Sequence, residues 1–234
     1  SLRVAEPPRA TLDVLDAAWG EPSWQAAARF LRRDLTRNGY YDIYRRALVY
    51  KQLLSFGPQP APEHLGPDAH PSTRNLANTR RFTDMIEVMR RLRNLLDGGP
   101  QVFYVTGWQY RGFDTGYPFV YDTDPRLGTV EDLRELIRRG PEFNAAVSMH
   151  DNYDDCYFGE TLGDHPMAMD SRGRPWRGWI WPAGLSYITG FRRYAESGQL
   201  DERVDRTVAQ YGFDTSYHLD VLSSEVRRYD YHPE

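Results

Sequence analysis

Three apolar, strand-like runs in the sequence lead into, or contain, polar residues that could do chemistry. They span residues 102–105, 145–149 and 217–223, and the last run carries Asp220 in its middle. Burying an isolated ionised Asp among apolar side chains is costly unless the site uses or compensates the charge. Acids, His and aromatic residues follow all three runs, and we interpret this pattern as a carbohydrate-type active site on the rim of an α/β barrel.

Asp220 is the best candidate for a nucleophile. Hydrolysis of a glycosidic bond usually needs two carboxyl groups, and a carboxylate at a strand end has a fixed position. His218 lies two residues earlier and points to the same face of its strand, as His150 and Asn152 do at the end of the preceding strand. Taken alone, Asp220 could cap a turn and each His could be structural. Two same-face pairs on adjacent strands favour a site.

Asp114 lies in a loop whose glycines, Gly112 and Gly116, give the backbone freedom for a close approach. A carboxylate there could hold sugar hydroxyls, or it could bond its own backbone in a turn. Asp155 could bind substrate or a cation, although it could also form a solvated pair with Asp154.

Aromatic residues and a single lysine add further candidates. Trp176, Trp179 and Trp181 fall within six residues beside Gly and Pro, which favours a stacking wall or lid over a helical core stripe. Lys51 is the only lysine among 29 basic residues, and its compact charge is one that Arg does not mimic. Chance survival of one lysine in an Arg-biased sequence explains Lys51 equally well.

Composition excludes several classes of function. The net charge of −4 gives no basic patch, so nucleic acid and anionic membrane are unexpected partners. No apolar run approaches the roughly 20 residues that span a bilayer, and the single cysteine, Cys156, excludes an internal disulfide framework. The chain starts without Met or a signal peptide, which suggests a processed or excised chain and leaves secreted and cytoplasmic locations both open.

The order of elements predicts how the candidate residues are positioned. We expect strands near 45–54, 102–108, 143–150 and 215–222, and helices near 24–37, 73–96, 130–140, 186–197 and 201–211. Long loops are expected over 56–71 and from 150 to about 184. Strand, loop, helix and strand in alternation indicate parallel strands with right-handed crossovers. Functional groups in barrels of this kind lie at the carboxyl ends of the strands.

Four strands are half of what a complete barrel needs. The predicted fold is therefore α/β, the N-terminal half of a (β/α)8 TIM-type barrel over residues 42–234, preceded by a lead-in and helix over 1–41. We expect the remainder of the barrel beyond residue 234.

The ordered motifs resemble one known family. They are Tyr50-Lys51, Gly107-Trp108-Gln109 with Asp114 and Pro118, Ser148-x-His150-x-Asn152-Tyr153-x-Asp155, and His218-x-Asp220. This series is similar to the catalytic barrel of endo-α-N-acetylgalactosaminidases, glycoside hydrolase family 101, and related bacterial barrels. The resemblance implies a retaining glycosidase for α-linked glycans, with Asp220 as nucleophile and a carbohydrate as partner, and no cofactor. It also implies that Asp114, His150 and Asn152 are substrate-binding residues and that the Trp segment is an aromatic lid. Our further candidates for substrate binding are Lys51, Trp108, Gln109, Asp155, Trp179, Trp181 and His218.

Two departures from the family pattern limit what the resemblance implies. Phe113 stands where family members usually have His, which leaves the sugar open. The family's acid/base Glu follows on the next strand and is expected outside this chain, because Glu225 is too near Asp220 and Glu160 lies in the wrong loop. Two alternatives therefore stay open: a metal-dependent hydrolase that uses His150, His218 and Asp220, or a carbohydrate-binding barrel without catalysis.

Overall fold

The computed structural model describes residues 40–55, 80–110, 112–159, 162–181, 184–222 and 229–233. Contacts divide the chain into residues 1–39 and residues 40–234, and only the second unit contains described residues. The helix predicted at 24–37 and the loop predicted at 56–71 lie outside the described residues. None of the described helices is long and apolar enough to cross a membrane.

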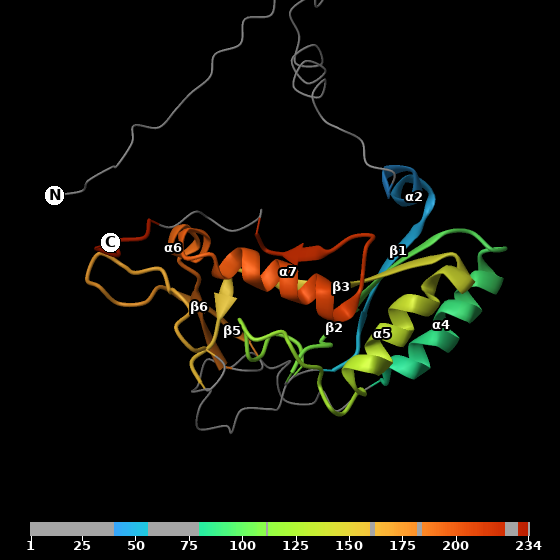
Figure 1. Cartoon of the computed structure of the whole chain (residues 1–234), viewed down its shortest axis with the longest axis horizontal. Helices are drawn as coiled ribbons and strands as arrows, with labels where there is room; N and C mark the ends of the chain where they lie inside the picture. The colour runs from blue at the N-terminus through green and yellow to red at the C-terminus, as the bar shows by residue number, and fades with distance from the viewer. Residues whose placement is uncertain are drawn as a thin grey trace, which may run out of the picture. The chain divides into compact units, whose positions relative to one another are not determined.

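A curled parallel sheet contains the three apolar runs that lead to the candidate site residues (Figure 1). Its strands are β1 (Leu48–Leu53), β2 (Gln101–Thr106), β3 (Ala145–Asn152) and β7 (His218–Asp220), in the order β1-β2-β3-β7. Every neighbouring pair is parallel, so the carboxyl ends of all four strands meet at one edge. This arrangement is half of a (β/α)8 barrel and confirms the predicted fold class.

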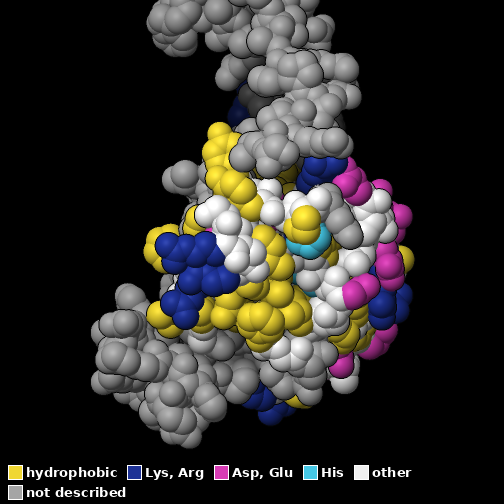
Figure 2. All heavy atoms as spheres, turned by 90° about the vertical axis from the view of Figure 1, so that its left-hand side faces the viewer, with side chains coloured by type: hydrophobic (Ala, Val, Ile, Leu, Met, Phe, Trp, Pro, Cys, Tyr) yellow, Lys and Arg dark blue, Asp and Glu magenta, His cyan; other side chains and the backbone are white. Residues whose placement is uncertain are grey.

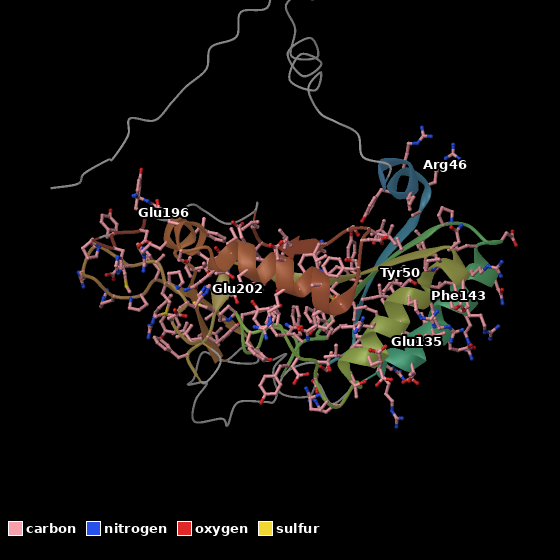
Figure 3. All side chains as sticks on the ribbon, viewed as in Figure 1. Arg46, Tyr50, Glu135, Phe143, Glu196 and Glu202 are labelled. Atoms are coloured by element: carbon pink, nitrogen blue, oxygen red, sulfur yellow. The ribbon has the colours of Figure 1, made fainter. Side chains whose placement is uncertain are left out.

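Helices α4 (Phe82–Leu95), α5 (Val130–Arg139) and α7 (Gln199–Tyr211) pack against one face of this sheet. The apolar side of α4 enters the core with Phe82, Met85 and Met89. Figure 3 shows Tyr50 and Phe143 among the side chains near this face, and Tyr50 stacks on Phe103 at 4.8 Å. Burial of these apolar groups is the main force that holds helices and sheet together.

Local sequence signals set the ends of α5. Thr129 and Asp132 form a capping box: the Asp132 backbone N–H donates to Thr129 Oγ1 at 3.2 Å, and the Thr129 N–H donates to Asp132 Oδ2 at 2.8 Å. The helix runs on into a 3-10 turn, η3 (Gly140–Phe143). A Cβ at Gly140 would lie 2.5 Å from the Ala145 carbonyl oxygen, so only glycine permits this tight entry into β3.

The short helix α2 (Tyr40–Arg46) precedes β1 and contacts β2. The hydroxyls of Tyr44 and Tyr104 lie 2.8 Å apart, while Arg46 extends into solvent (Figure 3). Tyr104 alternates with the core residues Phe103 and Val105 along β2. The α2 contact therefore reaches the sheet face opposite the helical layer.

A second sheet corrects the expectation for residues 150–197. The strands β4 (Asp155–Cys156), β5 (Arg177–Trp181) and β6 (Gly184–Ile188) form an antiparallel sheet in the order β4-β6-β5. The predicted loop to 184 is therefore partly sheet, and the predicted helix at 186–197 is β6 followed by the shorter α6 (Phe191–Glu196). Burial alternates along Gly184–Ile188 with the period of two that defines a strand, and the helix begins only after Gly190.

Candidate active site

Polar side chains from β1, β3 and β7 meet at the inner face of the parallel sheet. Lys51 Nζ lies 3.3 Å from His218 Nε2. The Asp220 carboxylate lies 3.7 Å from His150 Nε2 through Oδ2 and 3.9 Å from His218 Nε2 through Oδ1. The two imidazole rings stack with centroids 5.1 Å apart. We call Lys51, His150, His218 and Asp220 the Asp220 cluster.

Asp220 is the accessible carboxylate of the cluster. Its side chain is 36% exposed, whereas the His150 side chain is completely buried. Immediately after Asp220, Val221 has φ +51°, and the Leu222 N–H donates to the Asp220 carbonyl oxygen at 2.6 Å. A β-branched residue rarely adopts positive φ, and such strained positions concentrate at functional sites. The sharp turn carries the chain away directly after the carboxylate.

Both histidines of the cluster are held in the neutral form. Burial, followed by the positive charge of Lys51, lowers the pKa of His150 to about 3. The same two causes lower the pKa of His218. At neutral pH, Asp220 therefore lies beside two neutral imidazoles, which can donate or accept hydrogen bonds from a ligand without forming a strong ion pair.

Asp114 lies near the cluster but is almost completely buried, with 1% of its surface exposed. Burial and the negative charges of Asp155 and Asp220 raise its pKa well above the usual value, while Lys51 opposes this. Its backbone has φ +47°, and its Oδ1 has no hydrogen-bond partner among the described residues. A buried carboxyl group whose proton is retained can donate a hydrogen bond as well as accept one.

Trp108 and Gln109 are buried residues whose hydrogen bonds hold the backbone and a side chain near the site. Both side chains are fully buried. Trp108 Nε1–H donates to the His150 carbonyl oxygen at 2.8 Å, and Gln109 Nε2 donates to the Tyr117 hydroxyl at 2.8 Å. Their predicted role in substrate binding stays a prediction. The observed bond of Trp108 fixes the backbone that carries His150, and that of Gln109 holds Tyr117.

Asn152 and Asp155 bind each other and join the two sheets. Asn152 Nδ2 donates to Asp155 Oδ2 at 2.6 Å, and Ser186 Oγ on β6 donates to Asp155 Oδ1 at 2.6 Å. A Cβ at Gly178 would lie 2.3 Å from Ser186 Oγ, so glycine is needed for this approach. The described contacts give both residues a structural role beside the cluster.

The Trp-rich segment forms a β-hairpin. Trp179 lies on β5, is 57% exposed, and donates its backbone N–H to Ser186 Oγ at 2.9 Å. A β-bulge interrupts the pairing between Arg177 and Ile180, and bulges near active sites re-aim side chains. Trp181 is the last residue of β5. A sugar-stacking role for Trp179 and Trp181 remains a prediction.

The sequence reading missed a buried polar cluster behind the site. Arg203 on α7 forms an ion pair with Asp151 on β3, with 2.5 Å between Nη2 and Oδ1. Tyr217 donates its hydroxyl to Asp151 Oδ2 at 2.8 Å, and the Arg203 guanidinium lies 3.9 Å from the Tyr153 ring centroid. The available signal was the four-residue spacing of Arg203, Thr207 and Tyr211, which places Arg203 on the buried side of α7.

Three members of the Asp220 cluster also form a possible metal site. One ligand atom each from His150, His218 and Asp220 lies within 4.8 Å of the others. However, the Lys51 ammonium lies 3.3 Å from His218 Nε2, so that nitrogen already faces a hydrogen-bond donor. A fixed positive charge at this distance opposes a second cation. The geometry therefore favours an organic ligand over a metal ion.

Comparison with known proteins gives the same family as the motifs. The profile of the family described as endo-α-N-acetylgalactosaminidase, glycoside hydrolase family 101, matches residues 72–229. This range contains Asp114, His150 and Asp220, whereas Lys51 precedes it. A comparison with curated protein sequences finds no significant match.

Solved structures share the fold. The α-N-acetylgalactosaminidase NagBb from Bifidobacterium bifidum, without ligand, matches with a TM-score of 0.64 at 19% identity, covering 85% of this chain and 33% of its own. Its GalNAc complex matches with a TM-score of 0.70 at 18% identity, covering 90% and 34%. The maltogenic α-amylase AmyB from Thermotoga neapolitana matches with a TM-score of 0.50 at 14% identity, covering 77% and 40%.

The chain thus spans about a third of the length of NagBb. At these identities the structural matches establish the fold alone, which is part of a TIM-type barrel. The family match covers more than half of the chain and includes three of its four parallel strands. The chain belongs to glycoside hydrolase family 101, the endo-α-N-acetylgalactosaminidase family.

Proposed function

We propose that the protein is a retaining glycoside hydrolase for α-linked sugars and that Asp220 is its nucleophile. The observation that carries the proposal is the position of Asp220: it is an accessible carboxylate at the carboxyl end of a barrel strand, between two neutral histidines. Catalytic residues of this fold lie at that end of the strands. Membership of a glycoside hydrolase family supports the same chemistry.

In the proposed reaction, Asp220 attacks the anomeric carbon while an acid protonates the leaving glycosidic oxygen. A covalent glycosyl-enzyme forms, and water then releases the sugar with its original anomeric configuration. The second carboxyl group has to lie about 5–5.5 Å from the first in a retaining enzyme. We assign it to a part of the complete protein outside this chain, in the other half of the barrel.

Residues around Asp220 are proposed to bind the sugar. His150 and His218 present ring nitrogens beside the nucleophile, and Lys51 supplies a positive charge next to His218. Asp114 is buried with a raised pKa, so it can retain a proton and bond a sugar hydroxyl as donor or acceptor. Trp179 is exposed and offers an aromatic face for stacking.

The proposed substrates are α-linked N-acetylgalactosaminides or galactosides. The family description and the printed name of NagBb support an acetylated galactosamine. Phe113, which replaces the usual His, packs against His150 with ring centroids 5.5 Å apart. Phe113 therefore presents an apolar surface at the edge of the cluster, where a His would present a polar group. We expect this difference to alter which sugar is preferred.

The test uses the complete protein and aryl α-glycosides of N-acetylgalactosamine and galactose. We expect the wild type to release the aryl group and the first-formed sugar to be the α-anomer, measured by proton NMR. Asp220→Asn should lose activity, and added azide should restore turnover and yield a β-glycosyl azide. Unchanged hydrolysis by Asp220→Asn would remove Asp220 from the mechanism.

A metal-dependent hydrolase is the second candidate, because the ligand atoms of His150, His218 and Asp220 lie within 4.8 Å of one another. Elemental analysis of the complete protein by mass spectrometry separates the two. A stoichiometric metal, with activity lost to a chelator and restored by that metal, would favour this candidate. A binding barrel without catalysis would bind the glycans equally well as wild type and as Asp220→Asn, and would hydrolyse none of them.

A further inference from the structure

The loop between β2 and α5, which carries Asp114, is tied together across its base. The Asp124 backbone N–H donates to the Trp108 carbonyl oxygen at 3.0 Å, and the residues next to these two pair as an antiparallel bridge. The chain therefore leaves β2 and returns toward α5 along two paired segments. We call residues 112–121, which lie between these segments, the Asp114 loop.

Asp124 is a buried carboxylate at this base, with 1% of its surface exposed. Its Oδ1 accepts the Arg126 backbone N–H and Nε–H, both at 2.9 Å, and Ser55 Oγ lies 2.8 Å from its Oδ2. The Arg126 side chain is 42% exposed, so it approaches from the solvent side, whereas the buried Ser55 approaches from the interior. Buried charges are retained in proteins when they are paired and hydrogen-bonded, as Asp124 is.

Ser55 joins this base to β1. It is fully buried and lies just beyond the carboxyl end of β1. Its hydroxyl lies 2.9 Å from the Gly107 carbonyl oxygen as well as 2.8 Å from Asp124 Oδ2, so two acceptors share its single proton. Its carbonyl oxygen accepts the Phe113 N–H at 3.1 Å. Ser55 thus contacts the end of β2, the base of the loop and the Asp114 loop itself.

The approach of Ser55 to β2 requires glycine at position 107. Gly107 has φ +73°, and a Cβ there would lie 2.1 Å from the Ser55 carbonyl oxygen and 3.2 Å from Phe113 Cβ. Ser55 and Phe113 therefore pack against the same point of the backbone. Contacts this close leave little room for the Asp114 loop to shift unless Ser55 moves as well.

Ser55 and Asp124 are too deeply buried to bind a ligand themselves. Exposed surface is found elsewhere: Figure 2 faces the end of the molecule that carries β5 and β6, and it shows a broad hydrophobic surface with Lys and Arg side chains beside it. In contrast, Ser55 is 0% exposed and Asp124 is 1% exposed. Any effect of these two residues on activity therefore has to pass through the residues that they hold.

The residues that they hold are Phe113 and Asp114. The Phe113 ring packs against His150 with centroids 5.5 Å apart. Asp114 has φ +47°, which is uncommon outside glycine, and its Oδ1 has no hydrogen-bond partner among the described residues. Such a backbone conformation persists where surrounding contacts fix it. The bond from the Phe113 N–H to Ser55 is a contact of this kind on the adjacent residue.

We propose that Ser55 and Asp124 are positioning residues, which hold the Asp114 loop so that Asp114 bonds a sugar hydroxyl beside the Asp220 cluster. Ser55 acts from the end of β1, the strand that carries Lys51, and fixes the loop relative to that strand. Neither positioning residue touches the substrate. The inference rests on the proposed glycosidase function, because it gives Asp114 a bond to the sugar.

The test is a double-mutant cycle on the complete protein, with the aryl α-glycoside of N-acetylgalactosamine as substrate. Ser55→Ala removes the hydroxyl and leaves the volume of the side chain nearly unchanged. We expect it to lower kcat/KM about tenfold to hundredfold, because a small misplacement of a substrate-binding group has an effect of this size. In an Asp114→Asn background the same change should lower kcat/KM by less than about twofold, since the group that Ser55 positions is already altered.

Two further variants complete the design. Asp124→Asn keeps an oxygen acceptor for Ser55 but loses the ion pair with Arg126, and it should lower kcat/KM in the same Asp114-dependent way; it carries the test if Ser55→Ala does not fold. Thr207→Val is the matched control, because the Thr207 hydroxyl is also buried and donates to the Arg203 carbonyl oxygen at 2.6 Å. This control should keep the wild-type kcat/KM. Thermal unfolding of each variant checks that it is folded.

The His150 imidazole reports the position of Phe113 without any substrate. The ring current of Phe113 acts on His150, so Ser55→Ala and Asp124→Asn should shift the His150 Cε1–H resonance, whereas Thr207→Val should leave it in place. Proton–carbon NMR measures this shift, and the spectrum of His150→Phe identifies the resonance.

Full kcat/KM in the folded Ser55→Ala protein, an equal loss with and without Asp114→Asn, or an unshifted His150 resonance would overturn the inference. Absence of aryl hydrolysis by the wild type rejects the glycosidase proposal instead. The His150 resonance then decides alone whether Ser55 and Asp124 position the Asp114 loop.

Discussion

His150 and Asp151 are consecutive residues of β3, both fully buried, yet their surroundings differ in kind. Asp151 binds Arg203 and Tyr217 through its two carboxylate oxygens. Neither ring nitrogen of His150 has a hydrogen-bond partner among the described residues. Because successive side chains of a strand point to opposite faces, one residue faces the helical layer and the other faces the barrel interior.

The same division recurs on β7. Tyr217, just before the strand, bonds Asp151 in the helical layer, whereas His218 lies beside Lys51 and Asp220. Buried polar groups in stable proteins are nearly always hydrogen-bonded, so unsatisfied ones need a reason. Under the proposed function, bonds to a ligand would satisfy the His150 nitrogens on the inner face. We therefore expect changes behind the sheet to affect stability, and changes on the inner face to affect ligand binding and activity.

Arg203→Met gives the largest expected effect on stability. It leaves the buried Asp151 carboxylate without its cation, and breaking a buried ion pair typically costs about 3–5 kcal/mol. Denaturant unfolding of the complete protein, followed by far-UV circular dichroism, measures this loss. His150→Phe is the matched change on the other face, and it should change the free energy of unfolding by less than about 1 kcal/mol, since it removes unsatisfied polar atoms.

The activity of these two variants sharpens the contrast. His150→Phe should lower kcat/KM by at least about tenfold, the value of one lost hydrogen bond to substrate, while the protein stays folded. A His150→Phe protein that is as destabilised as Arg203→Met would contradict the division, because His150 would then be a structural residue.

Tyr217→Phe is expected to have the next largest effect on stability. It removes one hydrogen bond to a buried carboxylate and should cost about 1.5–3 kcal/mol. His218→Phe, one residue further, exchanges a half-exposed side chain and should cost less. Denaturant midpoints of the two variants provide the comparison, and the order reverses if His218 stabilises β7 more than Tyr217 does.

Stability should also fall as the pH is lowered from 6.5. Burial holds the pKa of His150 at about 3 and that of His165 at about 4, so the unfolded chain binds protons below pH 6.5 that the folded chain refuses. Each histidine therefore lowers the free energy of unfolding by about 1.4 kcal/mol per pH unit in that window. Neither contributes above pH 6.5.

His150→Phe isolates one of these two contributions. Between pH 6 and pH 4, its unfolding free energy should decline less steeply than that of the wild type, because His150 no longer binds a proton on unfolding, whereas His165 and His218 still do. Chemical denaturation at several pH values measures both slopes. Identical slopes would show that His150 titrates alike in the folded and unfolded protein, so that burial does not depress its pKa.

The parallel sheet was predictable because its two central strands, β2 and β3, begin as continuous apolar runs, the usual pattern of strands buried on both faces, and a helix separates them. Residues at the ends of these runs were predictable for the same reason, since parallel strands bring their carboxyl ends together. The structure brings Asp220, His150 and His218 together at these ends, and the contact of Lys51 with His218 brings the single lysine to the same cluster, whose role stays a prediction.

The antiparallel sheet was not predictable by the same reading. Its strands are short and rich in Trp, Gly and Ser, and the pairing of β5 with β6 is interrupted by a bulge. The pair of Asp151 and Arg203 joins residues 52 positions apart, so the spacing that places Arg203 on the buried side of α7 does not identify its partner. The antiparallel sheet and the Asp151–Arg203 pair both depend on contacts between residues far apart in the sequence. Such contacts determine whether a buried polar residue has a structural partner.

Lys51 gives the smallest expected effect on stability and the most direct test of the inner face. It is exposed, so Lys51→Met should change the free energy of unfolding by no more than about 0.5 kcal/mol. However, loss of the ammonium removes one of the two causes that depress the pKa of His218, and one of the causes that depress the pKa of His150. The pKa of His218 should therefore rise, and the imidazolium would then pair with Asp220 in mildly acidic solution.

Lys51→Arg is the matched control, because it keeps the positive charge while changing the geometry. Proton–carbon NMR of the imidazole Cε1 positions across pH 4–8 measures the His218 pKa in wild type and both variants. We expect the His218 pKa to be higher in Lys51→Met than in Lys51→Arg and the wild type. The acidic limb of the pH–activity profile of Lys51→Met should move to higher pH for the same reason. An unchanged His218 pKa in Lys51→Met would mean that burial alone keeps the inner face neutral, and the lysine would then be free to bind substrate.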